Sequence, residues 1–203
     1  MKVLFTVACV ILSLCAAPQQ GAPPEKKSSQ TISAPRFGEK LKLPGLPNGG
    51  KIDDSLFRGA QPQERGFLEL KRLGITTIVD LRQDNSQKLD WERKRAEAAG
   101  IRFLNIPVNG WSTPTIDQIA QFLSLFNDTH ERVFVHCRFG DDRTGVFIAS
   151  YRVARDGWTA DLAIKEMYLF GFNARWHPSM KTYIEEFPSA LKNAPALAPF
   201  NKK

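Results

Sequence analysis

Residues 133–145 read VFVHCRFGDDRTG, an apolar run that reaches Cys137, passes through a short polar loop containing Gly140 and leads into a second apolar stretch. The β-branched run predicts a buried strand over residues 133–136, and residues 144–155 predict a helix. In a parallel α/β sheet, ligands bind beyond the carboxyl ends of the strands, where the next helices begin. The segment therefore predicts a strand, a binding loop and a helix in direct succession.

Strand-like and helix-like segments alternate on both sides of this loop. The predicted strands cover residues 55–58, 75–81, 101–108 and 133–136, and the predicted helices cover residues 62–73, 89–99, 113–127, 144–155, 160–170 and 179–192. Strands separated by helices are typical of a parallel sheet covered by helices. We therefore predict one α/β domain over residues 46–192, with a central, mostly parallel sheet flanked by helices, and a frayed tail over residues 193–203.

The first 45 residues differ from this domain in composition. Lys2, an apolar run over residues 3–14 and the small residues after it form the three-part pattern of a secretory signal, which is too short to span a membrane. Residues 18–45 contain five prolines and few large apolar groups, a composition typical of a tether. We expect a signal peptide over residues 1–17, followed by a Pro-rich tether and then the exported domain.

Two processing routes are open. Cleavage after Ala17 would place Pro18 at the new terminus. Alternatively, residues 12–15 (Leu-Ser-Leu-Cys) resemble a bacterial lipoprotein box in which Cys15 is the lipidated residue, although Leu14 departs from the small residue usual there. The first route predicts a periplasmic or secreted protein, and the second predicts a lipoprotein tethered to a membrane.

Cysteine usage and charge restrict the function. Because Cys9 and Cys15 lie in the signal segment, the folded domain keeps one thiol, Cys137, which is either an inert buried residue or a reactive one. The net charge of +7 suits anionic small molecules or an acidic surface. The sequence has no dense basic run interleaved with aromatic residues and no zinc-ligand spacing, so we expect neither nucleic acid nor metal as a ligand.

The loop after the predicted strand has the chemistry of an anion site. Backbone amides that converge above a helix N-terminus bind tetrahedral anions, and the same positive potential stabilises a thiolate at Cys137. Arg143 lies six positions later, where the loop becomes a helix. Its planar guanidinium can hold two phosphate oxygens as the group flattens in a transition state. Together the two side chains predict a nucleophile and a clamp.

His136-Cys-x5-Arg-Thr-Gly145 resembles the signature loop of the cysteine-dependent protein tyrosine and dual-specificity phosphatases. Residues 57–62 (FRGAQP), 73–82 (LGITTIVDLR) and 106–108 (IPV) are similar to the matching blocks of small dual-specificity-like enzymes. The resemblance covers about residues 52–187. It implies that Cys137 attacks phosphorus and that water hydrolyses the resulting thiophosphate, without a cofactor. A phosphorylated protein or a small phosphomonoester would be the substrate, and we expect the enzyme to act as a monomer.

The resemblance also implies roles for the neighbours of Cys137. Thr144 would hydrogen-bond the sulfur and help it leave in the second step. His136 would orient the loop from beneath without touching the substrate. The remaining loop positions would line the substrate site: Arg138, Phe139, Gly140, Asp141 and Gly145.

The general acid is the point of departure from the family. Many members carry an aspartate shortly after the Ile-Pro block, where this chain has Asn109, Gly110 and Trp111. Related subgroups carry an aspartate directly before the arginine, and this chain has Asp142 there. We favour Asp142 as the general acid or as a residue that orients water; the alternative for its side chain is an ion pair with Arg143 that orders the loop. Asp117 is a second candidate, although a first-turn position in a helix accounts for it without catalysis.

Other residues bear on specificity. Asp141 stands where phosphoinositide-preferring relatives often have lysine, so we expect highly phosphorylated substrates to be disfavoured. Three basic side chains could offset its charge if they line the rim: Arg138, Arg175 and Lys181. We interpret Arg58 and Arg82 as structural. The tryptophans interpreted as core or rim packing are Trp111, Trp158 and Trp176.

Two other functions are compatible with a cysteine loop on an α/β sheet. A rhodanese-like sulfurtransferase has a shorter loop, whereas here Arg143 stands at the six-residue offset. An inactive phosphate-binding module would explain the missing mobile-loop aspartate. The intact Cys137, Arg143 and Thr144 favour the phosphatase.

Overall fold

The computed structural model describes residues 35–201. The predicted signal peptide, with Cys9 and Cys15, and most of the predicted tether lie outside the described residues. Within residues 35–201, none of the helices has both the length and the apolar character needed to cross a bilayer.

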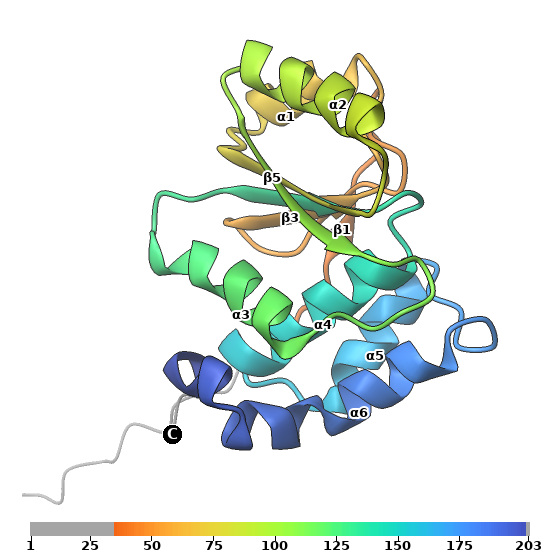
Figure 1. Cartoon of the computed structure of the whole chain (residues 1–203), viewed down its shortest axis with the longest axis vertical. Coiled ribbons are helices and arrows are strands. Elements are labelled where there is room, and N and C mark those ends of the chain that lie inside the picture. The colour runs from red at the N-terminus through yellow and green to blue at the C-terminus, as the bar shows by residue number, and fades with distance from the viewer. Residues whose placement is uncertain (1–34, 202–203) are drawn as a thin grey trace, which may run out of the picture. The chain divides into compact units, whose positions relative to one another are not determined.

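A six-stranded sheet forms the centre of the domain (Figure 1). Its strands, in spatial order, are β1 (Glu39–Lys40), β2 (Gly50–Lys51), β3 (Leu56–Gly59), β6 (Val133–His136), β4 (Thr77–Arg82) and β5 (Arg102–Val108). The four strands from β3 to β5 are parallel, and β1 and β2 form an antiparallel edge. His136 lies opposite both Gly59 and Asp80, so β3 and β6 end together beside Cys137, while β4 continues to Arg82. The predicted mostly parallel sheet is confirmed.

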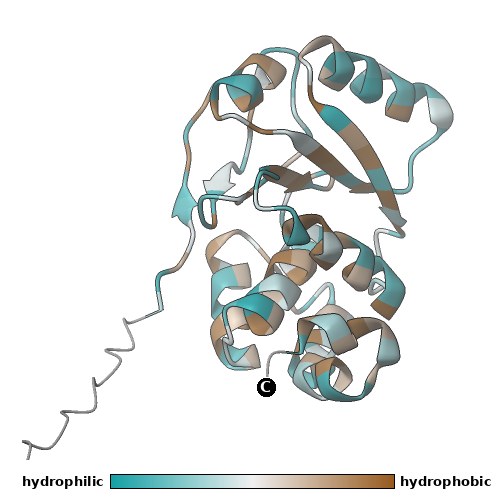
Figure 2. Ribbon diagram, turned by 90° about the vertical axis from the view of Figure 1, so that its left-hand side faces the viewer, coloured by the Kyte–Doolittle hydropathy of each residue, from teal (hydrophilic) through white to brown (hydrophobic). Residues whose placement is uncertain are grey.

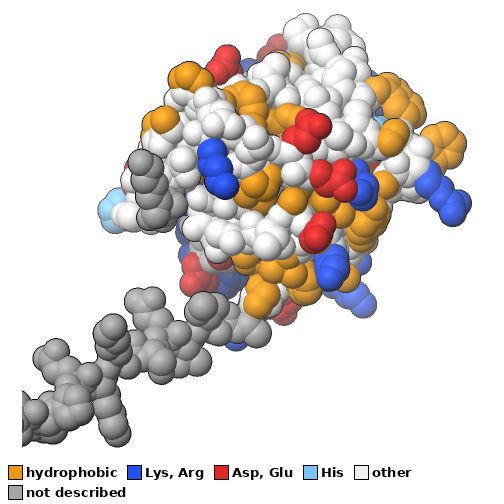
Figure 3. Space-filling view, turned by 90° about the horizontal axis from the view of Figure 1, so that it is seen from below, with side chains coloured by type: hydrophobic (Ala, Val, Ile, Leu, Met, Phe, Trp, Pro, Cys, Tyr) orange, Lys and Arg blue, Asp and Glu red, His pale blue; other side chains and the backbone are white. Residues whose placement is uncertain are grey.

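Helices cover both faces of the sheet. They are α1 (Gly66–Arg72), α2 (Ser86–Ala98), α3 (Ile116–Ser124), α4 (Asp142–Arg155), α5 (Ala160–Leu169) and α6 (Pro178–Asn193). Figure 1 shows α1 and α2 on one face and the other four on the opposite face. Seen from below, the outer surface of the second group carries acidic, basic and apolar side chains interspersed with one another (Figure 3).

Alternate strand residues supply two separate cores, because successive side chains of a strand point to opposite faces. Ile78 and Phe134 pack with the cluster under α1 and α2, whereas Val79 and Val135 pack with the cluster under α3 to α6. Figure 2 shows these central strands as largely hydrophobic. Within the second cluster α4 is buried without interruption over residues 144–154. The helix that follows the Cys137 loop is therefore held from all sides.

Both ends of the predicted domain need correction. The segment predicted as a tether reaches into the described residues, where Glu39–Lys40 pairs with β2 and the Gly38 amide donates to Glu166 Oε1 at 2.6 Å. The tail predicted to be frayed forms a 3₁₀ helix, Pro195–Phe200. Leu197 and Phe200 are buried against the helical layer, so burial of two apolar side chains orders a segment that was predicted to be frayed.

Replacing Leu197 tests this C-terminal packing. Leu197→Ala removes a completely buried side chain and is expected to lower the free energy of unfolding by about 2–5 kcal/mol. Leu68→Ala is the matched control, because Leu68 is 52% exposed and its loss is expected to cost about 0.5 kcal/mol or less. Urea denaturation of both variants measures the difference. Equal losses would show that the tail does not pack as described.

Candidate active site

Cys137 lies in the first position after the central strand β6, at the edge of the sheet where parallel strands end. Its side chain is 3% exposed, and the amide of Gly140 donates a hydrogen bond to Sγ at 3.3 Å. Helix α4 begins five residues after the cysteine, at Asp142. The sulfur therefore accepts a backbone N–H from a tight loop that leads into a helix N-terminus, where backbone amides can bind an anion.

Gly140 sets the shape of this loop. Its φ is +78°, and a Cβ at this position would lie 2.5 Å from the carbonyl carbon and oxygen of Gly59 and 2.6 Å from the Ala60 nitrogen. Only glycine combines this left-handed conformation with so close a backbone approach. The end of β3 therefore lies in direct contact with the loop. The FRGAQP segment, which contains Gly59 and Ala60, is the part of the chain that makes this contact.

Arg58 supports the loop from the same strand. Its guanidinium is completely buried, donates to the Gly140 carbonyl and lies 4.1 Å from the centre of the Phe170 ring. Burial lowers the pKa of Arg58 to about 10, an effect that the negative charges of Cys137, Glu166 and Asp141 partly oppose. These contacts agree with the structural role predicted for Arg58.

Arg143 is held at the ends of two strands. Its Nη1 donates to the Val108 carbonyl at 3.0 Å and approaches the Leu81 carbonyl at 3.5 Å. The guanidinium also borders a cavity of about 200 Å³, to which exposed Arg138 contributes a second positive charge. The other residues that line this cavity are Arg82, Gln83, Asp84, Asn109 and Gly110. A small cavity lined by three arginines and one aspartate beside the cysteine loop suits an anion.

Thr144 and Gly145 are placed differently from each other. Thr144 is completely buried, and among the described residues its Oγ1 has no hydrogen-bond partner, so the hydrogen bond predicted to Cys137 is not formed in this structure. Gly145 is buried in the first turn of α4, where a Cβ would contact Met167 at 3.4 Å. These surroundings indicate a helix-packing position for Gly145 rather than the substrate-lining position that was predicted.

Asp141 faces the edge of the sheet. Its Oδ1 accepts from the Asn48 side-chain amide at 2.7 Å, and the same amide donates to the Phe170 carbonyl at 2.9 Å. Burial first, and the charge of Asp142 second, raise the pKa of the Asp141 carboxyl. Through Asn48, Asp141 thus connects the loop to the segment between β1 and β2 and to the end of α5. This structural role was not part of the prediction, which placed Asp141 at the rim of the pocket.

Asp142 pairs with a residue that the sequence did not single out. Its Oδ2 lies 3.2 Å from His177 Nε2, and its Oδ1 accepts from the Asn173 amide at 3.4 Å. The His177 ring packs on Trp111 with 4.9 Å between ring centres. Among the described residues, Asp142 forms no ion pair with Arg143. The predicted alternative, an ion pair between these two side chains, is therefore wrong, because the partner of Asp142 is His177. Through His177, Asp142 is connected to the loop after β5, where many family members carry their acid.

The remaining candidates lie outside this constellation. Asp117 is exposed in the first turn of α3, whose N-terminus is closed by a capping box between Thr115 and Gln118. Lys181 forms an ion pair with Glu185 along α6. Arg175 is exposed. Three exposed aromatic side chains belong to the loop or its neighbours: Trp111, Phe139 and Trp176.

A buried charged cluster underlies the loop, and the sequence did not single out its two fully buried carboxylates, Asp80 and Glu92. His136 contacts Glu92 of α2 and Asp80 of β4, and Arg82 forms ion pairs with Asp80, Asp84 and Glu92. The sequence pattern could have identified Glu92 as buried. Glu92 lies on the same side of its helix as Leu89 and Ala96, which pack in the core under α1 and α2. A glutamate within an apolar stripe indicates a buried partner.

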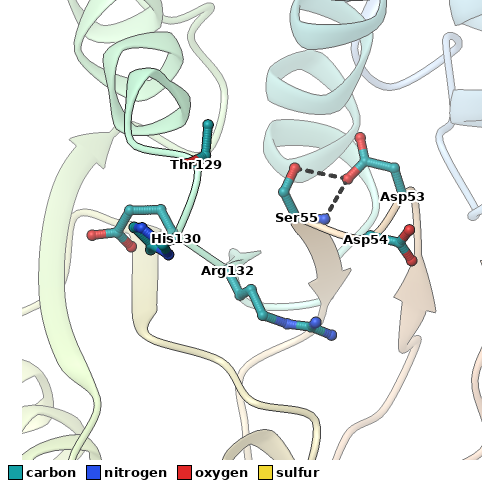
Figure 4. A pocket seen from close by; sticks show the side chains of 7 residues that line it. Asp53, Asp54, Ser55, Thr129, His130 and Arg132 are labelled. Carbon is teal, nitrogen blue, oxygen red and sulfur yellow. Dashed lines mark hydrogen bonds between the residues drawn. The ribbon is translucent and has the colours of Figure 1, made fainter.

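A second hollow, of about 570 Å³, lies at the opposite end of the strands, before the first residues of β3 and β6. There Asp53 Oδ1 accepts from the Ser55 amide and hydroxyl and from the Leu56 amide, while Oδ2 accepts from the Tyr151 hydroxyl. Figure 4 shows the other labelled side chains spread around the hollow without converging on one point. The Asp53 carboxylate closes the turn before β3 by accepting these hydrogen bonds. The residues that line the hollow include no cysteine nucleophile like Cys137.

Comparison with known proteins identifies the family of the chain. Residues 48–180 match the family described as "DSP-PTPase phosphatase fused to NAD+ Kinase". The chain therefore belongs to the dual-specificity and tyrosine phosphatase family, as the signature loop predicted.

Individual relatives are more distant. The dual specificity protein phosphatase TpbA of Pseudomonas aeruginosa is 28% identical over 123 residues, which are 60% of this chain and 54% of TpbA. The chain thus spans about half the length of this curated relative. The inositol diphosphatase DSP4 of Arabidopsis thaliana is 25% identical over 173 residues, covering 82% of this chain and 85% of the relative.

Solved structures share the fold. The crystal structure of P. aeruginosa TpbA has a TM-score of 0.62 at 24% identity and covers 79% of this chain and 99% of that chain. The catalytic core of the PP-IP phosphatase SIW14 from S. cerevisiae has a TM-score of 0.60 at 19% identity, covering 77% and 98%. At these identities the likeness establishes the α/β architecture.

Gly140→Ala tests the close approach of the loop to β3. At a positive φ, alanine is expected to cost about 1–2 kcal/mol by its own conformation, and the contact with Gly59 adds a steric overlap. Gly100→Ala is the matched control, because Gly100 has a φ of +76° and a Cβ there would meet no atom within 4 Å. The loss of unfolding free energy, measured in urea, should be clearly larger for Gly140→Ala. Equal losses would contradict the tight contact.

Proposed function

We propose that this chain is a phosphomonoester hydrolase in which Cys137 is the nucleophile and Arg143 holds the phosphoryl group. The observation that carries the proposal is the buried Cys137 sulfur, which accepts the Gly140 amide at the end of the central strand. The membership of the family supports the same conclusion.

The reaction proceeds in two steps. In the first, a sulfur lone pair forms an S–P bond, the ester P–O bond breaks, and the leaving oxygen receives a proton. In the second, water attacks phosphorus, the S–P bond breaks, and the thiolate and inorganic phosphate are released. Neither step changes an oxidation state, so the proposed chemistry requires no redox cofactor.

Residues around the sulfur have separate roles in this proposal. The Arg143 guanidinium donates hydrogen bonds to the equatorial oxygens of the phosphoryl group. The backbone amides of the loop from Arg138 to Asp141 surround the same group. The unpartnered hydroxyl of Thr144 is available to donate to the sulfur as it leaves. Asp142 donates the proton to the leaving oxygen and takes one from water in the second step. The contacts with His177 and the Asn173 amide support this role, because they fix the direction of the Asp142 carboxyl group.

The proposed substrate is a phosphorylated protein side chain or a small phosphomonoester. A solved structure of TpbA is described as a complex with pTyr, and the exposed rings of Trp111, Phe139 and Trp176 provide apolar surface near the loop for an organic group. We further propose that the protein acts as an exported monomer, in the periplasm, at a membrane through lipidated Cys15, or as a secreted enzyme. The N-terminal sequence pattern supports export.

Substitution of the nucleophile and the clamp tests the proposal. Cys137→Ser is expected to abolish vanadate-sensitive hydrolysis of 4-nitrophenyl phosphate, and Arg143→Lys to lower kcat/KM by about 100-fold or more, since lysine cannot hold two oxygens in one plane. Arg102→Lys is the matched control, because Arg102 lies exposed at the start of β5. Phosphate release measures the rates.

The alternatives give different results. Transfer of sulfur from thiosulfate to Cys137, detected by mass spectrometry in a protein without phosphatase activity, would identify a rhodanese-like sulfurtransferase. Phosphate binding without turnover in the wild type would identify an inactive binding module.

Asp142→Asn tests the proton donor. An alkyl phosphate has a poor leaving group and needs the proton, so its hydrolysis should fall by about 100-fold or more. The activated 4-nitrophenyl phosphate should lose much less. Asp117→Asn is the matched control and should leave both rates unchanged. Equal losses on the two substrates in Asp142→Asn would rule out Asp142 as the general acid.

A further inference from the structure

Glu92 reaches the catalytic loop from a helix on the other face of the sheet. The side chains of Glu92, His136 and Asp80 are each 0% exposed. Glu92 Oε1 lies 2.7 Å from His136 Nε2, and His136 Nδ1 lies 3.0 Å from the carbonyl oxygen of Cys137. One imidazole ring therefore connects α2 with the backbone of the proposed nucleophile.

The two contacts determine the protonation of this ring. A backbone carbonyl and a carboxylate can both only accept hydrogen bonds. Nδ1 must therefore carry a proton toward the Cys137 carbonyl. Nε2 lies 2.7 Å from Glu92 Oε1, a distance at which two lone pairs would repel each other, so Nε2 must carry a proton as well. With both nitrogens protonated, His136 is an imidazolium ion enclosed by protein.

The charges around the ring are balanced without a metal ion. Asp80 Oδ1 lies 3.9 Å from His136 Nδ1. Arg82 Nη2 lies 2.8 Å from Asp80 Oδ2 and 2.6 Å from Glu92 Oε2. Asp80, Glu92 and His136 lie close enough together to suggest a metal site, but the Arg82 guanidinium already binds both oxygens of Asp80 and Oε2 of Glu92. An additional cation would have to displace it, so we interpret the cluster as two cations paired with buried carboxylates.

We propose that Glu92 is a positioning residue for the reaction: it keeps His136 doubly protonated, and the imidazolium in turn holds the Cys137 carbonyl and the first turn of the phosphate-binding loop in place. A hydrogen bond from an ionised donor is roughly twice as strong as a neutral one. Glu92 thus fixes the backbone that carries the nucleophile without touching the substrate. The catalytic part of this inference rests on the function proposed above, whereas the ionisation of His136 does not.

Electrostatics support the geometric argument. Burial by itself lowers the pKa of His136, but attraction to Glu92 and then to Asp80, with the hydrogen bonds to Glu92 and to the Cys137 backbone, raises it to about 9. A histidine with a raised folded-state pKa stabilises the fold fully below its ordinary pKa of 6.5, and this stabilisation is lost as the pH rises through about 9. The Phe134 ring stacks on His136 with 5.8 Å between ring centres, and Arg82 pairs with the two carboxylates that face the imidazole ring.

Nuclear magnetic resonance of the histidine rings tests the ionisation. The chain has three histidines, so the ¹⁵N signals of His136 can be assigned by comparison with His130→Gln and His177→Gln variants of the full chain. In the wild type we expect both His136 nitrogens to be protonated at pH 7.5 and the ring to titrate near pH 9. In Glu92→Gln, which keeps the shape of the side chain and removes its charge, we expect a neutral ring at pH 7.5. Glu97→Gln, an exposed position on the same helix, should match the wild type.

The rate of hydrolysis is the second measurement. Loss of a residue that orients a metal ligand typically costs about 10–100-fold in activity. By analogy we expect a loss of about 10–100-fold in kcat for Glu92→Gln at pH 7.5, with Glu97→Gln unchanged. A wild-type His136 that is neutral at pH 7.5, or one that stays doubly protonated in Glu92→Gln, would overturn the assignment. A neutral ring in Glu92→Gln with unchanged kcat would overturn the positioning role.

These outcomes separate the inference from the proposed function. If the wild type hydrolyses no phosphomonoester, the proposed function fails and with it the catalytic role of Glu92, while the titration still decides whether Glu92 holds His136 protonated. If Glu92→Gln does not fold, the wild-type titration alone decides: a midpoint near 9 supports the pairing, and one near 6.5 contradicts it.

Discussion

The contact between the loop backbone at Gly140 and the end of β3 is the constraint on which the site depends. Gly140 has a left-handed conformation and leaves no room for a Cβ beside Gly59 and Ala60. This approach allows its amide to reach the Cys137 sulfur and its carbonyl to accept from Arg58. Gly140 thus contacts the end of β3, the buried Arg58 guanidinium and the Cys137 sulfur. The dense packing of α4 keeps the other end of the loop in place.

Charge compensation explains why so many ionisable groups are buried near one end of the sheet. Buried charges are expensive unless each has a partner, and removing one partner leaves the other exposed to the full cost of desolvation. Around His136 the cations and carboxylates pair with one another, and Asp141 is tied to Asn48. The arrangement holds the loop rigidly, which is the requirement for amides and a guanidinium that must be oriented before a substrate arrives.

Much of the fold was predictable from local patterns. The central strand, the glycine loop and the following helix are adjacent in sequence, so β6, Cys137 and α4 could be identified from residues 133–155 alone, and the family and the parallel sheet were confirmed. The C-terminal segment was not predicted, because the burial of Leu197 depends on a helical layer to which it is not adjacent in the chain. The partner of Asp142 could not be predicted from local sequence either, because His177 lies at the N-terminus of α6, far from Asp142 in the chain.

The sequence alone determined that a cysteine, a glycine and an arginine occupy one short loop between a buried strand and a helix, because these relations depend only on spacing and local conformation. The tertiary structure decided which groups surround that loop. Glu92 is brought beneath Cys137 by the packing of α2 on the sheet, and Asn48 meets Asp141 because the β1–β2 edge folds against the end of α5. Such contacts join residues that are distant in the chain, and a buried polar group reveals its partner only when the elements that carry both have been packed together.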